Sequence, residues 1–267
     1  MKRRFDIASV LIIIVGLAIV LYPTISNVLV SLNASRVVDT YTQAVDELTA
    51  DEAAALMDEA RAYNARLAAG AAPDEDAYGR ILDVAGDGVM GYITIPRLDE
   101  TMPIYHTCAE SVLQVGCGHI ETTSIPVGGS STHAAISGHR GLPTAKLFTD
   151  LDEMKLGDVF YIRVLRDTLA YEVDDIQTVL PDEVDALRVI SGEDRVTLVT
   201  CTPYGVNSHR LLVGAHRVPY AGEADDIIGR PGSPINLAPE HMVIVAAVAS
   251  LGFIIGVVRS KRKGERS

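Results

Sequence analysis

The hydrophobic and polar positions divide the chain into two uninterrupted apolar runs near its ends and a patterned middle. Residues 7–22 carry no charge, and neither do residues 242–258. Each run approaches the roughly 17 to 25 residues that a helix needs to cross a hydrocarbon core of about 30 Å. Basic residues precede the first run and follow the second, which by the positive-inside rule predicts two cytoplasmic termini and an extracellular middle. We therefore expect transmembrane anchors within residues 1–34 and 241–267.

A cleaved signal peptide is the alternative interpretation of the first apolar run, because the apolar part of such a peptide typically spans about 7 to 15 residues. No good small-residue cleavage site follows the run, and Leu32-Asn33-Ala34 is a poor candidate. We therefore prefer an uncleaved anchor. With either interpretation the middle of the chain is exported, and the second run holds it at the cell membrane.

Residues 35–88 have a helical pattern that gives way to a loop. Apolar residues recur at helical spacing from Val37 to Leu56, Ser35 is a plausible N-cap, and the pattern is interrupted near residues 49–51. This predicts two helices or one kinked helix, followed by a loop in residues 70–88. The helices either pack against the following domain or merely connect it to the anchor.

Residues 89–220 change to short β-type runs separated by glycine, proline and aspartate turn signals. The runs cover residues 89–95, 102–105, 134–137, 159–165, 169–179, 196–201 and 211–218. Strands this frequent predict an antiparallel barrel or sandwich, with short helical insertions at residues 144–152 and 181–187. Residues 221–240 are typical of a linker to the second anchor.

The charge balance is consistent with this division. The whole chain has a formal net charge of −12 but a positive mean hydropathy of +0.22, because the apolar residues are concentrated at the ends. Without the charges of the two anchor regions, the middle carries about −18. A nucleic-acid-binding protein needs a cationic surface, so we expect no nucleic-acid partner.

The most informative segment is VTLVTCTPYGVNSHRLLV, residues 196–213. A β-type run ends on Cys201, a turn follows, and the next strand opens with Arg210. A cysteine at a strand end lies at a sheet rim, and its thiol becomes a nucleophile when a cationic or basic neighbour favours the thiolate. Arg210 is placed to be that cation and to stabilise an oxyanion. A buried structural cysteine is the alternative, and the residue type alone favours it.

His139 is the candidate acid and base among seven histidines. It lies in ISGHRGLP, residues 136–143, where an apolar run meets a loop with glycine and proline. A histidine there would protonate a leaving amine and deprotonate an incoming nucleophile. We expect structural or surface roles for the other histidines. His133 and His139 have no recognised zinc spacing with the cysteines, so we predict no metal and no cofactor.

Three cysteines in an exported chain allow one disulfide and one free thiol, or three free thiols. Cys108 and Cys117 are close in sequence, whereas Cys201 is remote. The simplest pairing is a Cys108–Cys117 disulfide that leaves Cys201 free.

The quoted segments carry a family resemblance. TLVTCTPYGVNSHRLLV resembles the active-site strand pair of sortases, and SGHRGLPTAKLFTDL resembles the histidine segment of their class C, pilin-polymerising branch. GDGVMGYITIPRL and GHIETTSIPVGG extend the similarity over residues 71–218. The resemblance implies a mainly β fold: a closed sortase-type β-barrel with short helices, preceded by N-terminal helices and flanked by two transmembrane helices.

The resemblance also implies a mechanism. Cys201 matches the nucleophile that cleaves the Thr–Gly bond of an LPXTG-like sorting signal through a thioester, His139 the general acid and base, and Arg210 the residue that steadies the substrate. The implied partners are pilins or other surface proteins with such a signal, the acceptor lysine of another pilin, and the membrane. The alternatives are a housekeeping sortase that attaches proteins to peptidoglycan and a non-catalytic surface scaffold or binding domain.

A lid over the active site is common in this branch, with an aspartate and an aromatic residue at its centre. Asp76-Ala77-Tyr78 occupies the corresponding place, although proline or serine is commoner in the middle and phenylalanine or tryptophan at the end. The resemblance thus implies that Asp76 approaches an active-site cation and that Tyr78 covers the thiol. The alternative is a merely polar loop.

Overall fold

Two long helices form the N-terminal part of the computed structural model, which describes residues 2–183 and 185–230. Helix α1 spans Lys2–Glu47 and helix α2 spans Ala50–Ala68. Thr49 separates them with a capping box, in which Thr49 and Glu52 satisfy each other's backbone N–H groups. The predicted interruption is confirmed, but Ser35 is not an N-cap, because α1 continues through it from the apolar run.

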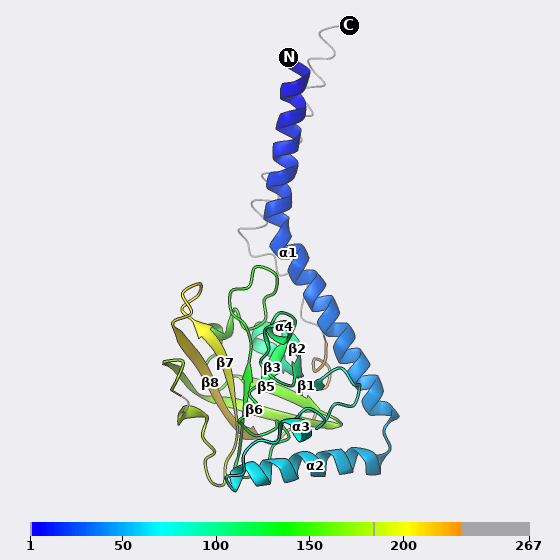
Figure 1. Cartoon of the computed structure of the whole chain (residues 1–267), viewed down its shortest axis with the longest axis vertical. Coiled ribbons are helices and arrows are strands. Elements are labelled where there is room, and N and C mark those ends of the chain that lie inside the picture. The colour runs from blue at the N-terminus through cyan, green and yellow to red at the C-terminus, as the bar shows by residue number, and fades with distance from the viewer. Residues whose placement is uncertain (1, 184, 231–267) are drawn as a thin grey trace.

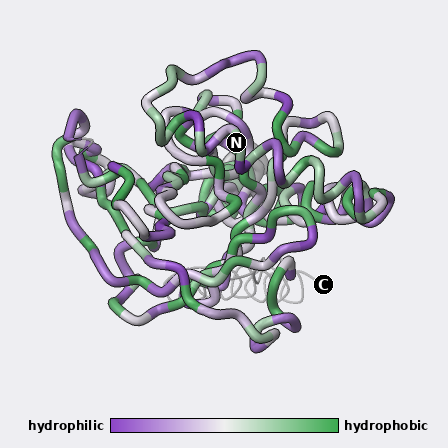
Figure 2. Tube along the Cα trace, turned by 90° about the horizontal axis from the view of Figure 1, so that it is seen from below, coloured by the Kyte–Doolittle hydropathy of each residue, from purple (hydrophilic) through white to green (hydrophobic). Residues whose placement is uncertain are grey.

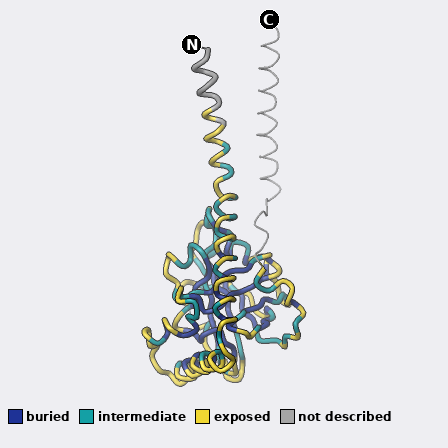
Figure 3. Tube along the Cα trace, turned by 90° about the vertical axis from the view of Figure 1, so that its right-hand side faces the viewer, coloured by how far each residue is buried: buried dark blue, intermediate teal, exposed yellow. Residues whose placement is uncertain are grey.

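Helix α1 projects beyond the barrel and bends along its length (Figures 1 and 3). It contains Pro23, which lacks the N–H that an unbroken helix would use. Among the described residues, this is the one helix long and apolar enough to cross a membrane. Ile12 and Ile19 are exposed on it, at 72% and 68%. The second apolar run and its predicted anchor lie outside the described residues.

Eight strands close into a barrel, in the order β1-β2-β3-β4-β7-β8-β6-β5. They are β1 Val89–Ile95, β2 Glu100–Tyr105, β3 Cys117–His119, β4 Thr132–Ser137, β5 Val159–Val164, β6 Asp167–Val179, β7 Asp194–Thr202 and β8 His209–Val218. The predicted closed, mainly β barrel is confirmed. It is not wholly antiparallel, because β2 pairs with β3 and β4 with β7 in parallel. The chain crosses over between these pairs, and parallel strands require such a connection.

The core fills the barrel and extends beneath the helices. In the barrel, hydrophobic and hydrophilic positions are mixed along the strands and loops (Figure 2), and buried residues concentrate there (Figure 3). Strand β1 is buried at every position, because helix α1 covers its outer face. The Tyr41 hydroxyl fixes this contact by donating to the Met90 carbonyl and accepting from the Leu165 N–H. The N-terminal helices therefore pack on the barrel.

Short helical turns complete the fold. They are α3 Glu75–Tyr78, α4 Glu110–Leu113 and the 3-10 turns η1 Pro96–Leu98, η2 Leu151–Glu153 and η3 Asp185–Leu187. The helical insertions expected at residues 144–152 and 181–187 are reduced to η2 and η3. In segments this short, few hydrogen bonds form to offset the unfavourable free energy of nucleating a helix, so most of each segment remains irregular.

Candidate active site

The three predicted catalytic residues lie at the ends of neighbouring strands. Cys201 near the end of β7 is the register partner of Arg210 at the start of β8. Strand β4 runs parallel to β7 and continues to Gly138, whose N–H donates to the Val199 carbonyl at 3.1 Å. The Thr200 hydroxyl donates to the Gly138 carbonyl at 2.7 Å. The next residue, His139, therefore emerges at the strand end beside Cys201.

The loop that carries His139 is fixed on both sides. At position 138 only glycine fits, because a Cβ would come within 2.7 Å of the Phe148 ring. Arg140 donates to the Thr202 hydroxyl at 3.0 Å and also pairs with Asp152. The loop after β4 is thus tied to the end of β7 at the rim.

A carboxylate that the sequence did not indicate contacts His139. The His139 Nε2 lies 3.2 Å from a carboxylate oxygen of Glu110, which is on α4. The Gln114 amide, one turn later, donates to the same carboxylate at 2.6 Å and holds it in place. These two hydrogen bonds lower the pKa of Glu110, with Gln114 the larger cause. No sequence signal links Glu110 to His139, because they are 29 positions apart and strands β3 and β4 lie between them.

In the described part of the chain, no carboxylate pairs with the guanidinium of Arg210. Its guanidinium donates to the backbone carbonyl of His209 at 3.1 Å and more weakly to that of Asn207 at 3.4 Å. Within residues 2–183 and 185–230, Arg210 forms no ion pair. A cation held by carbonyls, with no counter-charge, is suited to a developing oxyanion.

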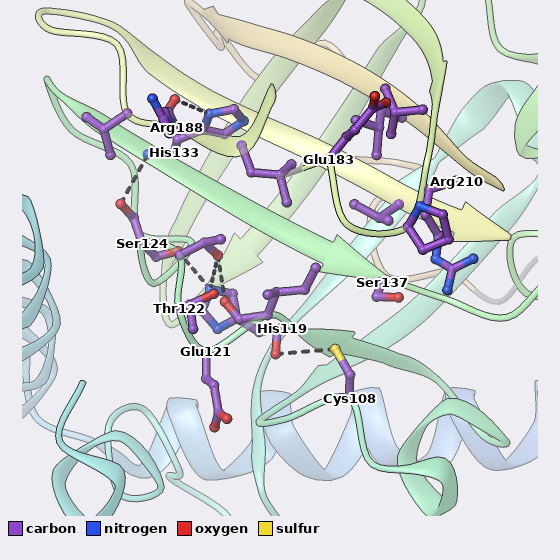
Figure 4. A pocket seen from close by; sticks show the side chains of 18 of the residues that line it. Cys108, His119, Glu121, Thr122, Ser124, His133, Ser137, Glu183, Arg188 and Arg210 are labelled. Carbon is purple, nitrogen blue, oxygen red and sulfur yellow. Dashed lines mark hydrogen bonds between the residues drawn. The ribbon is translucent and has the colours of Figure 1, made fainter. Parts of the chain in front are cut away.

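A groove of about 610 Å³ leads to this rim. Its apolar lining includes Ile120, Leu180, Pro181, Leu187, Val199 and Leu212. Arg210 and Ser137 lie together toward one end in Figure 4, with Glu183 across from them. Side chains two residues apart on a strand share a face. Cys201 therefore faces the same side as Val199, which lines the groove.

The segment between β6 and β7, which forms one groove wall, is held by His133 of β4. The His133 Nδ1–H donates to the Arg188 carbonyl at 2.9 Å, and its Nε2 accepts from the Thr197 hydroxyl at 2.8 Å. Burial lowers the pKa of His133, which favours the neutral ring that this pattern requires. His133 has the structural role expected of it, and the wall it holds belongs to the groove.

The predicted Cys108–Cys117 disulfide is absent, because all three cysteines in the described part of the chain are free. Cys117 is buried in the core with its sulfur 3.7 Å from that of Met102. The Cys108 thiol lies instead against the backbone carbonyls of Gly118 and His119. Burial, and secondarily the charge of Glu121, raises the pKa of Cys108 to about 11. Closeness in sequence was misleading, since the two thiols have different neighbours.

The lid prediction is not supported at Tyr78. This side chain is 2% exposed, and its hydroxyl donates to the His119 Nδ1 at 2.9 Å, so it is not free to cover Cys201. The His119 Nε2–H donates in turn to the Ser124 carbonyl at 2.8 Å, and burial lowers the pKa of His119 to about 4. Asp76 is exposed on α3 and forms no ion pair within the described residues.

A metal site finds no support in the described part of the chain, where no group of three or more histidine, cysteine, aspartate or glutamate side chains is arranged to hold an ion. The candidate site is the rim that carries Cys201, His139 and Arg210, and of these three Arg210 also lines the groove.

Comparison with known proteins identifies the family of the chain. A sortase domain model matches residues 93–218, which include all three residues. The crystal structure of sortase C1 from Streptococcus agalactiae is 42% identical, with a TM-score of 0.68 over 70% of this chain and 100% of that one. The chain belongs to the sortase family. Sortases are cysteine transpeptidases, so a thiol at the rim of this sortase matches the family chemistry.

Other relatives define the range of the similarity. Streptococcus pneumoniae sortase C is 42% identical, with a TM-score of 0.64 over 69% of this chain and 97% of that one. Among curated proteins, sortase A of Bacillus anthracis is 28% identical over 49% of this chain and 60% of its own length. Sortase A of Streptococcus agalactiae is 31% identical over 43% and 47%. This sortase thus spans about half of the curated relatives and nearly all of the class C structures.

Proposed function

We propose that this sortase is a membrane-anchored cysteine transpeptidase that cleaves an LPXTG-like sorting signal and joins the pilin subunit to a lysine of another pilin. The register pairing of Cys201 with Arg210, and the position of His139 just past the end of the neighbouring strand β4, support the proposal. A nucleophile, a proton carrier and an uncompensated cation are the groups that acyl transfer needs.

The reaction proceeds in two balanced steps. The Cys201 thiolate attacks the threonine carbonyl carbon of the Thr–Gly bond, and Arg210 stabilises the oxyanion. The C–N bond then breaks, the leaving amine takes a proton from His139, and a thioester remains. In the second step a lysine amine attacks the thioester, gives its proton to His139, and releases the Cys201 thiolate. The thioester retains the energy of the broken amide, so the transfer needs no nucleotide.

The groove supports a peptide substrate with apolar residues upstream of the cleaved bond. Val199 and Leu212 form part of its floor, and Leu180 and Pro181 part of its wall. These surfaces suit the leucine and proline of a sorting signal, which would bury their apolar side chains there. The threonine would then lie at the rim, beside Cys201.

A pilin substrate is proposed from the class of the structural neighbours. The structure of Streptococcus pneumoniae sortase C is described as giving insight into pilin substrate specificity, and a Streptococcus agalactiae sortase C1 is described as belonging to a pilus island. Helix α1 supports an anchor in the cell membrane, with the barrel outside, where exported pilins are held. The apolar run at residues 242–258 is proposed as the second anchor, with both termini cytoplasmic.

The test is transpeptidation by the purified full chain with an LPXTG peptide and a pilin lysine peptide. We expect a new amide and a trapped thioester on Cys201, both abolished in Cys201→Ala. Cys108→Ala is the matched control, because Cys108 lies by the groove with a protonated thiol, and it should retain activity. Product formation by Cys201→Ala would exclude Cys201 as the nucleophile.

The acceptor is tested by competition between the pilin lysine peptide and a cell-wall peptide amine. Preferential use of the lysine is expected for a pilin-polymerising enzyme. Preferential use of the cell-wall amine would contradict that assignment and favour a housekeeping sortase. A Cys201 that reacts with neither peptide and resists a thiol-directed probe would favour a non-catalytic scaffold.

A further inference from the structure

The catalytic rim lies at the end of the barrel from which the N-terminal part of α1 projects. In Figure 1 the loops that follow β4 and β7 both lie at this upper end, and α2 lies at the opposite end. A hydrogen bond fixes the relation between the rim and α1, since the Lys146 N–H in the loop after β4 donates to the Asn27 side chain at 2.8 Å. The position of this loop relative to the membrane therefore follows from the position of Asn27 along the helix.

The length of α1 up to Asn27 places the rim at the level of the lipid headgroups. The apolar run of α1 ends at Tyr22, before Pro23, and Asn27 follows five residues later in a segment that stays uncharged as far as Ser35. At about 1.5 Å per residue, Asn27 lies about 7 to 8 Å beyond the end of the apolar run. The headgroup region of one leaflet is about 5 to 8 Å thick. Residues 7–22 make only about 24 Å of helix, and a core of about 30 Å takes about 20 residues, so the uncharged residues 7–26 fill it. Asn27 and the Lys146 backbone beside it then lie where the headgroup region begins.

The end of β7 and the loop that follows it, residues 202–208, present apolar side chains at this same end. Tyr204 is 61% exposed and Val206 is 69% exposed. The Tyr204 ring packs against Gly141 of the loop after β4, since a Cβ at Gly141 would come within 3.0 Å of it. The two loops are therefore one surface. Residues 202–208 contain no acidic or basic residue, although the external domain is strongly acidic.

We propose that residues 202–208, here called the interfacial loop, dock on the lipid surface through Tyr204 and Val206. This inference rests on the proposed anchoring of α1 and deepens it, because it fixes the orientation of the barrel as well as its attachment. Tyrosine favours the membrane interface, where its ring is buried and its hydroxyl stays hydrated. Docking places Cys201 at the membrane surface, where a membrane-held sorting signal leaves the lipid.

The attraction is hydrophobic rather than electrostatic. The two cations of the adjoining loop are already paired, Lys146 with Glu100 and Asp150, and Arg140 with Asp152. An acidic domain gains nothing from anionic lipid, and Debye screening has little effect on contacts between uncharged groups. Docking of the interfacial loop should therefore persist in high salt. A protein partner on the same surface is the competing occupant, and the experiment separates the two.

The test uses the absence of tryptophan from the chain, which makes any introduced tryptophan a single fluorescent probe. Full-length Y204W is reconstituted in vesicles of phosphatidylcholine and phosphatidylglycerol with brominated acyl chains. Y22W reports insertion of α1, and A55W, on the exposed face of α2 at the far end, is the matched control. V206W repeats the measurement at the second apolar position if Y204W misfolds.

We expect Y204W to emit at shorter wavelength than A55W in the same vesicles, and to be quenched at least about half as strongly as Y22W, consistent with an interfacial position. A55W should not be quenched, and high salt should not change the pattern. Quenching of Y22W without quenching of Y204W and V206W would overturn the proposal and leave the surface to a protein partner. An unquenched Y22W would overturn the anchor and the docking together, whatever the outcome of the transpeptidation assay.

Discussion

His139 and His119 show how differently one residue type is used at the rim and in the interior of the barrel. His139 meets an exposed carboxylate at the rim of the barrel, whereas His119 is fully buried and both of its ring nitrogens bond to protein groups. The cysteines differ in the same way, since Cys201 is partly exposed and Cys117 is enclosed beside Met102. The groups proposed for chemistry keep access to substrate. The buried groups are held by contacts inside the protein, so they are not available to bind or attack a substrate.

The comparison is tested most severely by replacing His139. His139→Gln keeps a polar side chain but removes the proton carrier, and we expect transpeptidation to fall by about 10²- to 10⁴-fold. Initial rates with the LPXTG and lysine peptides measure the loss. His216→Gln, on β8 and paired with Asp174, is the control and should stay near the unmodified rate. Equal losses in both variants would show that His139 acts through stability alone.

The interior side of the comparison predicts a dependence of stability on pH. The pKa of His119 is about 4 in the folded state, below the ordinary unfolded value of about 6.5. As the pH falls from about 6.5 to 4, the unfolded chain binds a proton that the folded chain excludes, so the free energy of unfolding decreases by up to about 3 kcal/mol. Above that window the stabilising contribution is complete.

Urea unfolding at pH values between about 4 and 6.5 measures this decrease in the free energy of unfolding. In His119→Gln, the free energy of unfolding should depend less on pH over the same range. Since His119→Gln is expected to lower stability at every pH, the ring resonances of the unmodified protein provide a second measurement. They should show no protonation of His119 above about pH 5. A ring that titrates near its ordinary value would refute the structural role assigned to the buried cluster.

His133 lies between the two extremes, because it is structural but holds a wall of the groove. His133→Gln should lose the bond to the Arg188 carbonyl, and one such hydrogen bond is worth about 1 kcal/mol. We expect KM for the sorting peptide to rise several-fold with kcat nearly unchanged. Alkylation of Cys201 by a small thiol reagent should proceed at the normal rate. A fall in kcat with unchanged KM would place the effect of His133 at the rim instead.

The sequence was most informative where a property depends on neighbouring residues. The runs ending at Ile95, Val179 and Val218 all become strands that end there, and the strand and turn around Cys201 placed Arg210 correctly. It failed where a contact joins distant segments. The side to which Tyr78 turns depends on the position of His119, 41 residues later. The parallel pairing of β4 with β7 has no local signature, because it depends on barrel closure.

Glu110 should have the smallest effect of the residues compared, since a carboxylate whose side chain is 70% exposed is well screened by solvent. Glu110→Gln keeps the shape and removes the charge, and we expect transpeptidation to fall by no more than about two- to threefold at low salt. Raising the ionic strength should narrow the difference, because salt screens the charge of Glu110 in the unmodified enzyme. Gln114→Ala removes the hydrogen bond that holds the Glu110 carboxylate in place but leaves its charge. We expect it to lower transpeptidation still less than Glu110→Gln does. A loss as large as that of His139→Gln, unaffected by salt, would show that Glu110 is part of the catalytic group. His139 at the rim would then depend on its hydrogen-bond partner as strictly as the buried His119 does.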